Sequence, residues 1–211
     1  MGSFSCAENA LPFITNDHYN KACEVITKII HALKEKGLHF NGILNSGFFA
    51  LPDGIKNIEF NARFGDPECM NILSLFEGNW VHVMEKIAAG RLTAADIPLK
   101  KEASLVTYLV SPDYAVRKGQ AYDFNVDIEA AEQQDVNVFF SSAIQSNNTF
   151  QTIGTSRAVA LATTHSDLNQ ARQKLLSVIK NHVTGPLEYR TDIASSDYIE
   201  HLKQALIIQN K

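Results

Sequence analysis

The sequence predicts an α+β fold, in which helices and antiparallel strands occupy separate stretches of the chain. Three observations support this class. Apolar residues recur at helical spacing between residues 22 and 33. Two extended apolar stretches flank the turn signal of residues 52–54, which is typical of a hairpin. From residue 103 onward, several strand-like stretches precede one amphipathic helix, an order typical of a compact α+β unit.

Composition narrows the class of protein. The 211 residues suit one large domain or two small ones, and a hydrophobic content of 45% is enough for a buried core. The net charge of -4, without a basic block, argues against a nucleic-acid or membrane-surface partner. No apolar run is long enough to cross a bilayer. The 3 cysteines form no C-x-x-C pair, which predicts reduced thiols in a cytoplasm.

The first predicted elements are a loop and a helix. Residues 2–11 are small and polar and are expected to form the loop. Thr15 or Asn16 is expected to cap the helix, and Gly37 is expected to end it. The apolar positions expected to pack are Ala22, Val25, Ile26, Ile29, Ile30 and Leu33. This spacing places them on one face of the helix.

A hairpin and two further helices are expected next. The hairpin strands are predicted at residues 42–50 and 55–61. Helices are predicted at residues 68–76 and 80–89, followed by a linker at residues 93–101. The core candidates of these helices are Met70, Leu73, Leu75, Val81, Met84 and Ile87.

A second module is predicted from residue 103. Its strands are expected at residues 104–110, 122–128, 136–144 and 157–163. Asp167 is expected to cap a helix that follows them. The expected packing face of that helix is Leu168, Ala171, Leu175, Leu176 and Ile179. Residues 195–211 are predicted to form a last helix.

Residues 58–68 carry the candidate site. On a strand, Glu59, Asn61 and Arg63 point to one face. Ile58, Phe60 and Ala62 point to the other face and suit a core. The polar row therefore aligns a carboxylate, an amide and a guanidinium. For an arbitrary Glu-x-Asn-x-Arg pattern, the better interpretation would be a buried strand with one polar face.

The polar row suits a metal and an anion. Mg²⁺ takes oxygen ligands and keeps waters and substrate phosphates at its other positions, and Glu59 and Asn61 offer two oxygens. Arg63 can bind a phosphate or carboxylate with its planar fork. Pro67, after the turn, suits the first position of the next helix, and Glu68 suits its first turn.

Residues 41–68 resemble the second half of an ATP-grasp catalytic domain, and more narrowly the glycinamide ribonucleotide synthetases (phosphoribosylamine–glycine ligases). That family carries Glu-aromatic-Asn followed by Arg-Phe-Gly-Asp-Pro-Glu. The matching positions are Glu59, Phe60, Asn61, Ala62, Arg63, Phe64, Gly65, Asp66, Pro67 and Glu68. Residues 1–5 and 189–193 are also similar, in the same order, so the resemblance spans most of the chain.

The resemblance implies ATP-driven amide formation between glycine and 5-phosphoribosylamine in de novo purine biosynthesis. It implies ATP as co-substrate and Mg²⁺ (or Mn²⁺) as cofactor, both bound at Glu59 and Asn61. Arg63 would be catalytic and would balance charge on the transferred phosphoryl group or a substrate. The residues implied at the substrate edge are Arg63, Gly65, Asp66, Pro67 and Glu68. For Asp66 and Glu68, purely structural roles in the turn and the helix start are equal alternatives.

Family members are considerably longer than this chain. Their glycine-rich phosphate loop and lysine-bearing lid would precede Met1, so the resemblance implies that this chain is a C-terminal portion. The missing N-terminal half of the enzyme is then an implied partner. We expect the chain alone to be inactive. The expected organisation is residues 1–100 as the second half of the ATP-grasp domain, residues 103–193 as a small C-terminal α+β domain, and residues 194–211 as a terminal helix.

Several positions depart from the family pattern. Asn45 stands near the place where related enzymes can have an additional acidic ligand. Residues 111–114 and 154–157 replace glycine-containing motifs, which leaves Arg157 either a substrate residue or a surface arginine. Cys69 replaces a commoner polar residue. These departures favour an alternative function, a non-catalytic interaction protein that keeps the fold and docks onto a partner.

Overall fold

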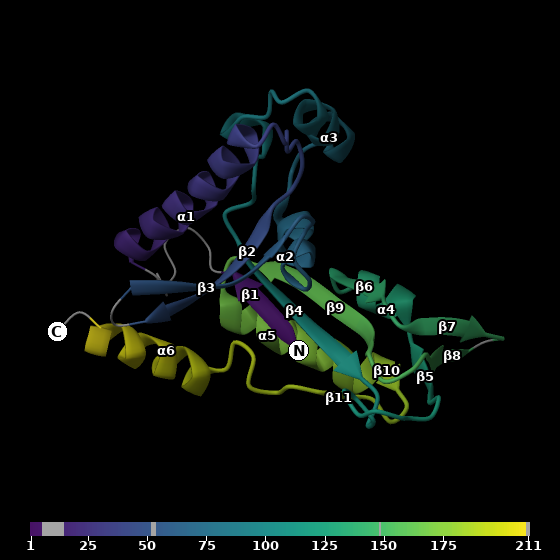
Figure 1. Ribbon diagram of the computed structural model, residues 1–211. Coiled ribbons are helices and arrows are strands. Elements are labelled where there is room, and N and C mark those ends of the chain that lie inside the picture. The colour runs from purple at the N-terminus through teal and green to yellow at the C-terminus, as the bar shows by residue number, and fades with distance from the viewer. Residues whose placement is uncertain (6–14, 52–53, 148, 210–211) are drawn as a thin grey trace. The chain divides into compact units, whose positions relative to one another are not determined.

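The computed structural model describes residues 1–5, 15–51, 54–147 and 149–209 (Figure 1). The chain divides into two compact units. One unit comprises Met1–Ala10, Met70–Leu75 and Lys101–Tyr198, and the other comprises Leu11–Cys69, Phe76–Lys100 and Ile199–Lys211. We call them the sheet unit and the hairpin unit. The expected domain boundaries at residues 100, 103 and 194 stay a prediction.

An antiparallel sheet forms the centre of the sheet unit. Its strands follow the order β1 (Gly2–Ser5), β4 (Ala103–Val110), β9 (Arg157–His165) and β6 (Val136–Phe140). A short strand, β11 (Glu188–Tyr189), pairs with β4 beyond the end of β1. Every residue of β4 is buried, so both faces of this strand are covered.

Strand β1 corrects the expectation of a loop at residues 2–11. Residues 2–5 pair with β4, with Gly2 opposite Thr107, whereas residues 6–11 lie outside the described residues. A Cβ atom at Gly2 would lie 2.4 Å from the backbone oxygen of Val106. The small residues that read as a loop therefore permit a close approach of two backbones.

Two helices pack on the central sheet. Residue Met70 of α2 (Glu68–Leu75) joins a buried cluster with Val106, Tyr108, Ala160 and Ala162. Helix α5 (Leu168–His182) packs against β4 and β9, and Asp167 caps it by accepting from the backbone N–H of Gln170 (Figure 1). The predicted cap and start of this helix are confirmed. The buried residues of α5 are Leu168, Ala171, Leu175, Val178 and Ile179.

A smaller sheet has the strand order β10 (Val183–Thr184), β5 (Asp123–Val126), β8 (Thr149–Thr152) and β7 (Ala143–Ser146). The strand expected at residues 136–144 is in fact two strands, β6 and β7, which belong to different sheets. Between the two strands, the backbone N–H groups of Ser141 and Ser142 donate to the backbone oxygens of Ala158 and Arg157, at the start of β9. A short helix, α4 (Ile128–Glu132), begins at the last residue of the strand predicted at residues 122–128.

The hairpin unit begins with α1 (Asn16–Glu35), whose predicted start and end are confirmed. Thr15 is the N-cap and forms a capping box with His18. Gly37 follows the helix with a φ of 73°. All six apolar residues predicted to pack are half-buried, as befits a helix with one covered face.

The other elements of this unit are β2 (Asn45–Leu51), β3 (Gly54–Asn61) and α3 (Trp80–Ala88). Val83 of α3 is 1% exposed, whereas Val81 is 67% and Met84 is 40% exposed. The prediction that Val81 and Met84 lie in the core was therefore wrong. An apolar stripe gives the spacing of a buried face, but α3 has apolar residues on more than one side.

The remaining helices are short or terminal. The expected linker at residues 93–101 contains a 3-10 turn, η1 (Ala94–Asp96). Helix α6 (Ser196–Gln209) matches the predicted last helix. None of the helices in the described part of the chain is both long and apolar enough to span a membrane.

Candidate functional site

Glu59 and Asn61 lie together on one face of β3. The Nδ2 of Asn61 donates a hydrogen bond of 2.7 Å to Oε1 of Glu59. Residues of a strand two positions apart share a face, and this bond shows that the two side chains also turn toward each other. The Glu59 side chain is exposed and therefore accessible to a ligand.

The expected apolar face of β3 is not a core. Ile58 is 54% exposed and Phe60 is 37% exposed, and Ala62 is exposed as well. The prediction that these residues are buried was therefore wrong. In the described part of the chain, the sheet of β2 and β3 has only two strands, and a two-stranded sheet covers little apolar surface.

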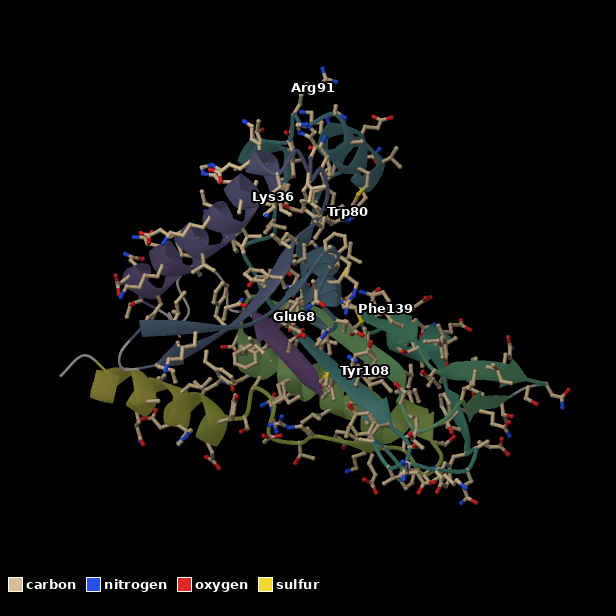
Figure 2. The ribbon with its side chains drawn as sticks, in the orientation of Figure 1. Lys36, Glu68, Trp80, Arg91, Tyr108 and Phe139 are labelled. Atoms are coloured by element: carbon tan, nitrogen blue, oxygen red, sulfur yellow. The ribbon has the colours of Figure 1, made fainter. Side chains whose placement is uncertain are left out.

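The loop after β3 comes close to β2. Asn45 of β2 pairs directly with Asn61, so both residues belong to the same face of the hairpin. A Cβ atom at Gly65 would lie 2.7 Å from Nδ2 of Asn45 and 2.5 Å from Oε2 of Glu68. Gly65 thus brings the first residue of α2 next to the end of the hairpin that carries Asn61 (Figure 2).

The turn itself combines buried and exposed residues. Gly65 and Pro67 are buried, whereas Asp66 and Glu68 are exposed. The carbonyl of Gly65 accepts from the backbone N–H of Cys69 at 3.0 Å, which closes the first turn of α2. The Asp66–Pro67 peptide bond is cis, and α2 begins at Glu68, the predicted start, so Pro67 directly precedes the helix.

Arg63 lies beyond the end of β3, so strand alternation does not fix its direction. Its Nη1 donates a hydrogen bond of 2.7 Å to the backbone oxygen of Phe64. A guanidinium has five N–H donors, so the exposed Arg63 side chain retains donors for an anion. The ring of Phe64 in turn meets the Trp80 ring edge-on, with 5.7 Å between the ring centres. The ring centre of Phe76 lies 4.4 Å from that of Trp80.

Cys69 adjoins this loop. Burial raises the pKa of the Cys69 thiol, and the nearby Asp66 raises it further. The thiolate is the nucleophilic form of cysteine, so Cys69 is a poor nucleophile at neutral pH. We therefore interpret the half-buried Cys69 side chain as a packing residue.

The donor set of the hairpin fits a hard divalent cation. Glu59 offers a carboxylate, and Asn61 offers an amide oxygen once its side chain is turned toward the ion. Among the described residues, no cluster of three or more histidine, cysteine, aspartate or glutamate side chains could hold a metal by itself. Two protein oxygens suit Mg²⁺, which retains waters and substrate phosphates as its other ligands.

Arg157 belongs to the sheet unit, at the start of β9. Its guanidinium lies over the Tyr108 ring, 5.1 Å from the ring centre, and its Nη1 lies 3.3 Å from Sδ of Met1. A guanidinium over an aromatic face is a favourable cation–π arrangement. Sequence patterns gave no signal for this stacking, because Tyr108 and Arg157 meet only through strand pairing.

Comparisons with known proteins point to one family. Residues 1–69 match the family model of the phosphoribosylglycinamide synthetase ATP-grasp (A) domain. A phosphoribosylamine–glycine ligase of Pyrococcus furiosus is 36% identical over 200 residues, which are 95% of this chain and 44% of the relative. One of Methanocorpusculum labreanum is 33% identical over 208 residues, 97% of this chain and 47% of the relative.

Solved structures agree on the fold. The phosphoribosylamine–glycine ligase of Thermotoga maritima superposes with a TM-score of 0.74 at 20% identity, covering 92% of this chain and 46% of that chain. A biotin carboxylase domain of a thermophilic 2-oxoglutarate carboxylase gives a TM-score of 0.60 at 15% identity over 100% of this chain and 48% of that chain. These likenesses show an ATP-grasp type of α+β fold.

The chain spans less than half the length of the curated relatives it matches, 44% for the ligase of Pyrococcus furiosus. The match extends over nearly the whole of this chain and includes the segment with Glu59 and Asn61. In sequence and fold, the chain belongs to the phosphoribosylamine–glycine ligase family and corresponds to the C-terminal portion of its members.

Proposed function

We propose that this chain supplies the metal-holding part of a phosphoribosylamine–glycine ligase. The reaction joins glycine to 5-phosphoribosylamine with ATP and yields glycinamide ribonucleotide, ADP and phosphate, in the cytoplasm. The observation that carries the proposal is the contact between Glu59 and Asn61 on one exposed face of β3, 2.7 Å apart. Homology to ligases over nearly the whole chain supports the choice of substrates.

Glu59 and Asn61 would hold Mg²⁺ (or Mn²⁺) against the phosphates of ATP. When bound, such an ion neutralises charge on the phosphates during transfer. Arg63 would donate to a phosphoryl oxygen or to a substrate carboxylate. Gly65, Asp66, Pro67 and Glu68 would form the substrate edge of the site, with Gly65 setting the distance between this loop and Asn45.

The chemistry needs no nucleophile from the protein. A carboxylate oxygen of glycine attacks the γ-phosphorus of ATP, ADP leaves, and an acyl phosphate forms. The amine of phosphoribosylamine then attacks the carbonyl carbon, inorganic phosphate leaves, and the amine loses a proton. Positioning and charge neutralisation supply most of the rate in such transfers. The Cys69 thiol, with its raised pKa, takes no part in these steps.

The proposal includes a partner, the remaining portion of a ligase. A complete site would combine the hairpin face with elements that bind the nucleotide, and we expect the isolated chain to form no product. The test is to mix this chain with a separately produced N-terminal portion of a phosphoribosylamine–glycine ligase and to measure phosphate release that depends on glycine and phosphoribosylamine.

Within that assay, Glu59→Gln removes the carboxylate with little change of shape. We expect it to lower the turnover rate at least about 100-fold, because it removes a charge that acts on the transition state. The matched control is Glu77→Gln, an exposed glutamate of the same unit outside the hairpin, which should keep the rate. Equal rates for the two variants would contradict the assignment of Glu59, and steady product formation by the isolated chain would contradict the need for a partner.

A docking role without catalysis is the second candidate. The observation that favours it is the side chain of Asn45, which is not acidic and packs against Gly65. Its Nδ2 is only 2.7 Å from the place that a Cβ atom at Gly65 would occupy, so Asn45 makes a structural contact. A stable complex with the N-terminal portion that forms no product, with or without Glu59→Gln, would support this role over the ligase role.

A further inference from the structure

The outer edge of β7 lacks the features that normally prevent strand pairing. β7 (Ala143–Ser146) ends the strand order of the smaller sheet and pairs with β8 alone among the described strands. Natural edge strands are usually protected by charged side chains, proline or a bulge. The sequence contains no charged residue and no proline between Asp135 and Arg157, a stretch that includes all of β7. The ladder between β7 and β8 has no register shift.

The opposite end of the same sheet is different. β10 has two residues, and Gly185 and Pro186 follow it directly. Proline cannot donate a backbone hydrogen bond, so an additional strand could not pair far along the edge of β10. Within this sheet, the edge of β7 is therefore the one open to pairing.

The pairing between β7 and β8 fixes which backbone groups point outward. The backbone N–H of Ile153 donates to the backbone oxygen of Ser142 at 2.8 Å. Ser142 and Ile153, which lie opposite each other just before β7 and just after β8, are therefore a hydrogen-bonded pair. Antiparallel pairs alternate between hydrogen-bonded and non-hydrogen-bonded types. Ile144 and Ser146 are therefore also bonded toward β8. The N–H and C=O groups of Ala143 and Gln145 consequently point away from β8.

We propose that two copies of this chain pair through β7 in an antiparallel, two-fold arrangement centred on Ile144. In this register Ala143 of one copy lies opposite Gln145 of the other, so their outward backbone groups satisfy each other twice. Ile144 lies opposite Ile144 as a non-hydrogen-bonded pair, in which side chains approach most closely. Ile144 is 50% exposed in the single chain, so this contact buries apolar surface.

A second copy fits this edge because the edge is complementary to itself. A two-fold axis places identical residues in identical environments, and an uncharged strand meets no like-charge repulsion in doing so. The partner is therefore a second copy of the same strand. The inference does not depend on the ligase activity.

Cysteine cross-linking tests the register. Under mild oxidation, Ile144→Cys should form a covalent dimer, since opposite Cβ atoms in a non-hydrogen-bonded pair lie close to disulfide distance. Ile153→Cys is the matched control, because Ile153 has the same 50% exposure but lies outside β7. The unsubstituted chain sets the background from its own cysteines, and mass spectrometry identifies the linked peptides.

We expect the dimer linked at position 144 to exceed the Ile153→Cys dimer by roughly tenfold, because pairing raises the local concentration of the two thiols. Equal cross-linking of the two variants would overturn the proposed register. Sedimentation of the unlinked protein gives a second measurement. Ile144→Lys should weaken dimerisation at least about tenfold, because it places two like charges directly opposite each other, and Ile153→Lys should change it little. Dimerisation that both lysine variants weaken equally, or neither weakens, would overturn pairing through β7.

Discussion

At the scale of single residues, Gly65 sets the distances within the candidate site. A Cβ atom at this position would lie 2.5 Å from Oε2 of Glu68 and 2.7 Å from Nδ2 of Asn45, so a side chain here would displace both of those side chains. The sequence predicted the shared face of Glu59 and Asn61, because strand alternation alone determines it. It could not predict the bond from Arg63 to Phe64, because the conformation beyond a strand end depends on the local turn. It also could not predict the contacts of Gly65, which join segments apart in the chain.

Replacing Gly65 by alanine should destabilise the hairpin unit. We expect Gly65→Ala to lower its free energy of unfolding by about 1–3 kcal/mol, because the added methyl overpacks the contact with Asn45 and Glu68. Trp80 is the single tryptophan of the chain and contacts Phe64, so its fluorescence in a urea titration reports this unit.

The control for this change is Gly47→Ala in β2. A Cβ atom there meets only Ile58, at 3.7 and 3.8 Å, which are ordinary contacts. We expect the Gly47→Ala chain to unfold near the unsubstituted midpoint. A Gly65→Ala midpoint equal to that of Gly47→Ala would show that the contact tolerates a methyl group.

At the scale of elements, the predictions succeeded where the sequence marks the start or the end of a helix with a capping residue or a glycine. Helices with a capping residue, such as Thr15 and Asp167, were predicted close to their true ends. Strands β1, β10 and β11 were missed because each is short and is held by pairing with a strand distant in sequence. Local propensity carries no information about such pairing.

The connection after α3 has a charged clamp with a pH dependence. Asp96 accepts from the backbone N–H of Thr93 and forms an ion pair with Lys86. The hydrogen bond from Lys86, followed by those from Thr93, lowers the pKa of Asp96 from 3.8 to about 2. Because the pKa of Asp96 is lower in the folded than in the unfolded chain, its ionised carboxylate stabilises the folded state at every pH above the unfolded-state pKa. This stabilisation is lost as the pH falls through the folded-state pKa.

Asp96→Asn should therefore destabilise the hairpin unit at pH 7. The difference from the unsubstituted chain should persist down to pH of about 4 and disappear near pH 2, where Asp96 itself is protonated. Urea midpoints from Trp80 fluorescence across this range measure it. Asp17→Asn, which removes an exposed ion pair with Lys21, should have a smaller effect at pH 7. A difference independent of pH would argue against the clamp.

At the scale of the whole molecule, the sequence predicted the α+β class and the order of most elements. It did not predict that β1 belongs to the same sheet as β4 and β9. It also assigned Ile58 and Phe60 to a core, because an alternating apolar pattern shows which residues share a face but not whether another layer covers them. Phe49 of β2 is 60% exposed, so the hairpin unit presents several large apolar side chains.

If the hairpin meets the N-terminal portion of a ligase, Phe49 should contribute to that contact. We expect Phe49→Ala to weaken the complex by about 1–3 kcal/mol, roughly 5- to 150-fold in the dissociation constant, because it removes buried apolar area. Titration calorimetry measures this. Val116→Ala, at a 47% exposed position of the sheet unit, is the control. Equal affinities would place the hairpin outside the contact.

The pairing of β1 with β4 has a consequence for a clipped chain. A protease that cuts among the exposed residues near Arg91 and Lys100 would separate the polypeptide into two pieces. The earlier piece would still carry Gly2–Ser5 and Met70, both of which are held in the sheet of the later piece. Such a nicked protein would migrate as one species on a native column and as two bands in detergent, so a single native peak is no proof of an intact chain.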